Sequence, residues 1–185
     1  MVSYANDLNF RKLKNGDNMA ATIEICESNT VSETITHNIT NSNMGSVDTV
    51  NLDPVANPIT PGNRSFAKYQ RVHVTAMGGS SKIDNLKIWR TGALGGAATH
   101  VTNARLTSYA GALTYATPVA SAVTSVDQTM PTSTPASANL GIAGSLTGSL
   151  TATGYSDYLG HQIITNGADT AGSTSTMNYQ YDETA

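Results

Sequence analysis

The chain has 185 residues, of which 39% are hydrophobic and only 12% charged, and its formal net charge is −3. This length suits one domain, which can bury roughly 70% of its unfolded surface and needs no metal or disulfide to fold. The slight negative charge gives no reason to expect nucleic acid as a partner. No run of about 20 apolar residues predicts a membrane helix.

Residues 1–18 differ in character from the rest of the chain. They carry a small basic cluster at Arg11, Lys12 and Lys14, and no apolar block follows it, so we predict no secretory signal peptide. A weak amphipathic pattern ends at Gly16. We therefore expect an N-terminal arm or extension over residues 1–18, either docked on a neighbouring subunit or frayed, before one β-sandwich domain over residues 19–185.

Alternating apolar residues predict strands over residues 22–26 and 31–40. Cys26 is the one cysteine, so an intramolecular disulfide is impossible, and we interpret it as a small core hydrophobe rather than a reactive thiol. A long irregular connection is expected over residues 44–64, where Pro and Gly mark several turns.

The clearest alternation lies at residues 71–89, RVHVTAMGGSSKIDNLKIW. It predicts a β-hairpin that turns at Gly78 and Gly79, because glycine reaches positive φ angles without steric cost. A short strand is expected over residues 100–106. The pattern then weakens over residues 108–158, and so long a loop in a compact domain indicates a binding surface, or a surface covered by other copies.

Strand patterns return at residues 158–165 and 174–181, which we predict to form a second hairpin. Seven or eight short strands with polar turns and no long helix favour an all-β fold, an antiparallel β-sandwich of jelly-roll type with long loops. The residues expected in the shared core are Val72, Val74, Leu86, Ile88, Ile163 and Tyr179.

The sequence offers no recognisable catalytic, cofactor-binding or metal-binding motif, so we predict a protein that is not an enzyme and has no cofactor. None of the four histidines has a His or Cys partner at metal-ligand spacing, which leaves open only a site assembled by folding. We interpret them as side chains on the polar faces of strands. The four are His37, His73, His100 and His161.

Two further groups of residues contain side chains suited to metal binding or catalysis. Asp48 and Asp53, with Asn51 between them, lack the closing glutamate of a calcium loop. Ser156, Asp157 and His161 include the residue types of a catalytic triad, but a strand directs such neighbours to different faces, so no triad is expected.

Several segments resemble a group of tailed-bacteriophage virion structural proteins. They are GSVDTVNLDPVANPITPGNRSFAKY at residues 45–69, KIDNLKIW at 82–89, TYATPV at 114–119, GYSDYLGHQ at 154–162 and YQYDE at 179–183. Together they span most of residues 20–183. The resemblance implies a β-rich component of the capsid surface or of the tail and neck.

The leading hypothesis from this resemblance is a capsid cement or decoration protein that bridges major capsid proteins and stabilises the phage head. A surface with few charges suits such contacts, because burying it leaves few charged groups without a partner. The expected location is the virion, assembled in the host cytoplasm. The expected partners are the major capsid protein or other virion proteins and further copies of the chain, with which we predict a trimer. Neither nucleic acid nor a membrane is expected.

The alternative is a tail, neck or fibre component with a carbohydrate- or receptor-binding β-sandwich. Such a site needs exposed aromatic rings to stack on sugars. Tyr109, Tyr115, Tyr155 and Tyr158 lie in or near the predicted loops.

Overall fold

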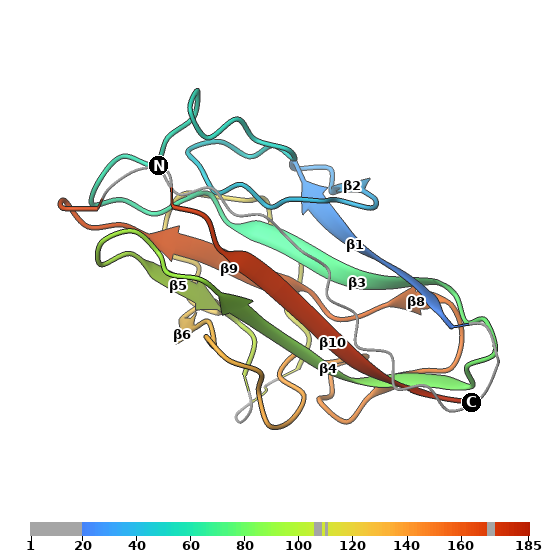
Figure 1. The fold of residues 1–185 in the computed structure, drawn as a ribbon. Helices are drawn as coiled ribbons and strands as arrows, with labels where there is room; N and C mark the ends of the chain where they lie inside the picture. Colours follow the sequence, from blue (N-terminus) through green and yellow to red (C-terminus); the bar gives the residue numbers. More distant parts are fainter. Residues whose placement is uncertain (1–19, 106–108, 110, 170–172) are drawn as a thin grey trace.

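The computed structural model describes residues 20–105, 109, 111–169 and 173–185. Over these residues the chain forms strands and no helix, and every strand pair is antiparallel, in two sheets (Figure 1). The predicted all-β, antiparallel sandwich is thus confirmed, while the jelly-roll type stays a prediction. The predicted arm over residues 1–18 lies outside the described residues. No helix suited to crossing a membrane occurs in the described part of the chain.

The larger sheet has the strand order β2-β1-β3-β9-β5-β6, and β8 also pairs with β3. The smaller sheet has the order β10-β4-β7. The larger sheet comprises β1 (Thr22–Asn29), β2 (Thr34–Thr36), β3 (Lys68–Ala76), β5 (Thr99–Thr102), β6 (Gln128–Thr129), β8 (Gly154–Tyr155) and β9 (Leu159–Ile164). The smaller comprises β4 (Lys82–Thr91), β7 (Ser149–Leu150) and β10 (Thr176–Thr184).

Both predicted hairpins are wrong in their pairing. β3 and β4 form where the alternation predicts them, but β3 pairs with β1, β8 and β9, whereas β4 pairs with β10 and β7 in the other sheet. Their connection turns at Gly78, which has a φ of 58°. β9 and β10 are divided between the sheets in the same way. Alternation specifies which side chains face the core, but it does not specify the hydrogen-bonded neighbour.

The strand predicted over residues 31–40 is shorter in the structure. Only β2 forms there, and Val31 before it is 80% exposed. The long connection over residues 44–64 is confirmed as free of named strands. The region expected to be one loop, residues 108–158, contributes three strands of two residues each, β6, β7 and β8.

The predicted core residues are all buried, which confirms the alternation as a guide to burial. One cluster joins both sheets and includes Val72, Leu86, Ile88 and Tyr179. Ile163 packs in a second cluster with Met44 and Ile59 from the long connection. The buried set is Val72, Val74, Leu86, Ile88, Ile163 and Tyr179.

The interior also holds a polar network. Glu27 and Lys68 are 1% exposed each, and Lys68 Nζ lies 2.6 Å from Glu27 Oε1. Gln70, paired with Glu27 in the β1–β3 register, donates to Glu27 Oε2. The Tyr179 hydroxyl of the smaller sheet donates to Gln70 Oε1 at 2.8 Å. This network therefore fixes the position of one sheet against the other.

Candidate metal centre

The outer face of β1 and β3 carries a cluster of polar side chains. Ile25 points into the core, so the alternation of a strand places Glu24 and Cys26 together on the opposite face. In the β1–β3 register Glu24 pairs with His73 and Cys26 with Arg71. Antiparallel pairing thereby brings His73 beside the carboxylate of Glu24.

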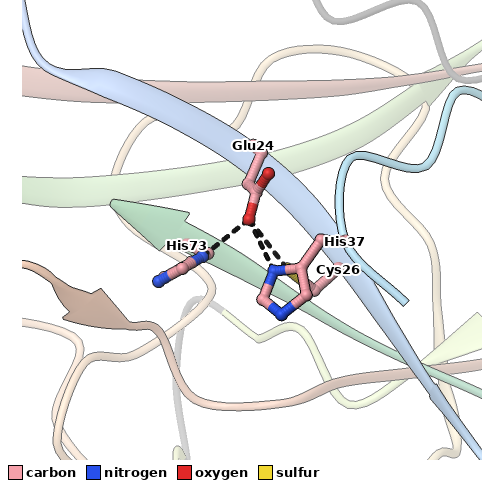
Figure 2. A group of neighbouring side chains, drawn as sticks. All are labelled: Glu24, Cys26, His37 and His73. Carbon is pink, nitrogen blue, oxygen red and sulfur yellow. Dashed lines mark hydrogen bonds and ion pairs between the residues drawn. The ribbon is translucent and has the colours of Figure 1, made fainter. Parts of the chain in front are cut away.

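His37 reaches the same place from the segment that follows β2. The backbone amide of Ile39 donates to the carbonyl of Ile25 at 3.0 Å, which holds this segment along β1. Figure 2 shows Glu24, Cys26, His37 and His73 converging on a common point. Their four ligand atoms, one carboxylate oxygen, one sulfur and two ring nitrogens, all lie within 4.8 Å of one another.

Glu24 Oε1 is the hub of these contacts. It lies 2.6 Å from Nδ1 of His37 and 2.7 Å from Nδ1 of His73. The thiol of Cys26 donates to the same oxygen at 3.6 Å, and its sulfur lies 3.2 Å from His37 Nδ1. An ionised carboxylate only accepts hydrogen bonds, so both imidazoles present an Nδ1–H to it.

The electrostatics of the cluster follow from these contacts. Burial alone would raise the pKa of Glu24, but hydrogen bonds from His73, His37 and Cys26 outweigh it, and the pKa is lowered. Burial, with the negative charge of Glu24 beside it, raises the pKa of Cys26 to about 12. The cysteine is 2% exposed, as a core hydrophobe would be, but its sulfur faces polar groups.

Neighbouring side chains support His73. The ring of Tyr155 on β8 stacks on the imidazole, with centroids 4.0 Å apart and planes 9° from parallel. The guanidinium of Arg71 lies over the Tyr155 ring, 4.5 Å from its centroid. His37 is the most accessible member of the cluster, with 48% of its side chain exposed, against 18% for Glu24 and for His73.

This cluster is not evident from the sequence because its members are far apart along the chain. Cys26 and His37 are separated by 11 positions, and Glu24 and His73 by 49. One signal could have found part of it: in the predicted strand over residues 22–26, Glu24 and Cys26 have the same parity. The missing information was the pairing of β1 with β3, which no local pattern specifies.

The other two histidines form a buried pair, so their assignment to polar strand faces is wrong. His100 and His161 are each 1% exposed, and Nε2 of His100 lies 2.9 Å from Nδ1 of His161. Burial, with the charge of Lys68 nearby, lowers the pKa of His161 to about 3. Burial, followed by the charges of His161 and Arg90, lowers the pKa of His100 well below its usual value.

The two aspartates that could contribute to a calcium loop contact different parts of the chain. Asp48 accepts from the backbone amide of Thr30, and Asp53 accepts from that of Val55. Asp48 thus ties the 44–64 connection to the turn between β1 and β2, whereas Asp53 fixes its own loop.

The side chains of Ser156, Asp157 and His161, which have the residue types of a catalytic triad, each bond to a different partner. Ser156 donates to the backbone carbonyl of Asp157, the Asp157 carboxylate accepts from Tyr109, and His161 contacts His100. No hydrogen bond that we find among the described residues joins the three side chains.

Comparisons of the chain with protein-family models, curated proteins and solved structures found no match. The resemblance to tailed-phage virion proteins therefore stays a prediction.

Proposed function

We propose that this protein is a non-enzymatic structural component of a tailed-phage virion, and that it acts as a capsid cement or decoration protein assembled in the host cytoplasm. The observation that carries the proposal is the way buried polar side chains hold the long loops in fixed conformations. A loop ordered before it meets its partner loses less conformational entropy on association. Such loops suit a protein whose work is to bind neighbours.

Gln162 on β9 joins two of these loops. Its side-chain amide, buried in the domain, donates to the backbone carbonyls of Ser65 and Ser121, each at 3.0 Å. Its Oε1 accepts from the amide of Val123. One residue thereby ties the end of the 44–64 connection to the loop that precedes β6.

Asn139 and Asp157 hold two further segments. The Asn139 side chain donates to the carbonyl of Ile88 and accepts from its amide, as a neighbouring strand would. The carboxylate of Asp157 accepts from the Tyr109 hydroxyl at 2.6 Å and from the Gly144 amide. Long stretches without strands are thus ordered by the domain itself.

The exposed faces of these loops carry apolar side chains that a partner could cover. The large hydrophobic residues at the surface lie in loops or on the edge strand β2, a position where an unpaired strand can also accept another chain. They are Val31, Ile35, Val55 and Val119, with exposed fractions of 80%, 36%, 74% and 40%.

The tyrosines considered for sugar binding have partners within the chain. Tyr115 packs against Tyr69 and Tyr158, and its hydroxyl donates to the carbonyl of Thr30. Tyr109 is bonded to Asp157, and Tyr155 is stacked on His73. These contacts favour the structural role over the carbohydrate-binding alternative.

The test is the place and copy number of the protein in purified particles. A decoration protein should be present in a fixed, high ratio to the major capsid protein by quantitative mass spectrometry, with matching density over the capsid in cryo-electron microscopy. A few copies at one vertex would contradict the decoration role. Absence from washed particles would contradict the virion role altogether.

A variant can test whether the loops make the contact. Val55→Asp places a charge on an exposed loop residue and should weaken binding to particles that lack the protein. The matched control is Ala152→Asp, an exposed apolar residue in the turn between β7 and β8. Equal binding by both variants would argue against a docking role for the 44–64 loop.

A further inference from the structure

We propose that Glu24, Cys26, His37 and His73 bind one zinc ion, which acts as a structural cross-link between β1, β3 and the segment that follows β2. This inference is independent of the virion role, because it rests on the geometry of the outer face alone. The ion would join three segments that are far apart in sequence.

The donor set favours zinc among the divalent metals. Two imidazoles, one thiolate and one carboxylate are ligands that zinc accepts in tetrahedral sites, whereas calcium and magnesium require oxygen ligands. The charges also match. A thiolate and a carboxylate together neutralise Zn²⁺, so the loaded site adds no net charge to a partly buried position.

The separations are close to those of a tetrahedral site. Bonds of about 2.0–2.3 Å place the ligand atoms roughly 3.3–3.8 Å apart along the edges of the tetrahedron. Cys26 Sγ already lies 3.2 Å from His37 Nδ1 and 3.6 Å from Glu24 Oε1. The two Glu24–histidine contacts, at 2.6 and 2.7 Å, must open by roughly 1 Å to admit the ion.

That opening needs only side-chain movement. The glutamate has three rotatable bonds, and His37 lies outside the named strands with half of its side chain in solvent. His73, by contrast, lies on β3, and the stacked ring of Tyr155 restricts its movement. Binding releases the thiol proton of Cys26 to solvent. Each imidazole binds through Nδ1 in its neutral form, so its remaining proton lies on Nε2.

Four protein ligands fill the four positions of a tetrahedral zinc, which is the arrangement of structural rather than catalytic sites. The accessible side of the cluster at His37 gives the ion a route from solvent without unfolding of the sheet. The expected consequence is a firmer attachment of the edge strand β2, since His37 directly follows it.

The experiment uses the untagged full chain, treated with EDTA and titrated with Co²⁺ as a spectroscopic probe and then with Zn²⁺. We expect one equivalent of Co²⁺, the visible bands of tetrahedral cobalt, and a near-ultraviolet thiolate-to-cobalt band that zinc abolishes by displacement. Zinc should also raise the thermal unfolding midpoint, and EDTA should reverse this. No stoichiometric binding, or an octahedral spectrum without the thiolate band, would overturn the proposal.

Variants separate the site from adventitious binding. His37→Gln and Cys26→Ser should each weaken binding by more than the about 10–100-fold that loss of an outer-shell partner costs. The exposed carboxylate of Asp127 supplies a control, and Asp127→Asn should bind as the wild type does. If Cys26→Ser does not fold, the test rests on His37→Gln, because His37 is half-exposed and its replacement should leave the fold intact. Wild-type affinity in His37→Gln would overturn the proposed ligand set.

Discussion

Replacing Lys68 with methionine tests the buried network that joins the two sheets. The Lys68 ammonium donates to Glu27 Oε1 and to the carbonyl of Thr49, and both charged side chains are at most 2% exposed. The substitution keeps most of the aliphatic volume and removes the charge. Among the residues that the structure describes, Glu27 would then keep the amide donors of Asn29 and Gln70 and no ion-pair partner.

The expected loss is about 3–5 kcal/mol of unfolding free energy, the usual cost of removing one partner of a buried ion pair. Total stabilities are about 5–15 kcal/mol, so this is a large fraction. For a domain of this size it corresponds to a fall of roughly 6–20 °C in the unfolding midpoint. The matched control is Lys82→Met. Its pair with Asp84 has a similar N–O distance of 2.8 Å but is 41% and 25% exposed, so a loss of only about 0–1 kcal/mol is expected.

The assay is urea unfolding followed by the fluorescence of Trp89, the one tryptophan of the chain, with the midpoint compared at a constant m value. Adding Glu27→Gln to Lys68→Met removes the stranded charge and should restore part of the lost stability, since neighbouring groups are not additive. A loss below about 1 kcal/mol in Lys68→Met would refute the reasoning, as would strict additivity in the double variant.

Three further predictions concern stability. The pKa values of His100 and His161 are lowered in the folded protein, so below about pH 6.5 the unfolded chain binds more protons than the folded one. The free energy of unfolding should therefore be highest above that pH and fall toward pH 3. The fall attributable to His161 is up to about 1.4 kcal/mol per pH unit. His161→Gln should flatten this dependence in unfolding measured across the range, and an unchanged slope would contradict the assignment. A Cβ at Gly148 would collide with the backbone carbonyl of Ile142, whereas a Cβ at Gly167 would have nothing within 4 Å. Gly148→Ala should therefore lower the unfolding free energy by about 1–3 kcal/mol or more in thermal unfolding, and Gly167→Ala by much less. Equal effects would argue against the close approach at Gly148. Asn139→Ala leaves the amide and carbonyl of Ile88 without their side-chain partner. It should lower the unfolding free energy by about 1–3 kcal/mol for each of the two groups in the same urea assay. A neutral effect would show that other groups replace these hydrogen bonds.

The sequence predicted the strands that have a clear period of two. Residues 71–76 and 86–89 alternate, and the residues assigned to the core there are buried. It could not predict which strands pair. The same alternation is compatible with a hairpin and with a crossing between two sheets, because both place Val72 and Ile88 in one core.

The metal-binding cluster and the buried histidine pair could not be predicted from the sequence for the same reason. Glu24, Cys26 and His73 meet only once β1 pairs with β3, and the His100–His161 contact depends on the pairing of β5 with β9. The strands of two residues, such as β7, are too short to show any period. For the candidate site, sequence reasoning supplied only the strand over residues 22–26, which carries Glu24 and Cys26.

The division of β3 and β4 between two sheets also bears on how the chain is synthesised. The smaller sheet combines residues 82–91 with residues 176–184, so β4 has no long partner until the last strand has left the ribosome. Pairing over such separations is slow and leaves apolar strand faces uncovered in the meantime. Nascent chains should therefore depend on chaperones, and a product that stops before β10 should be degraded or aggregate rather than fold.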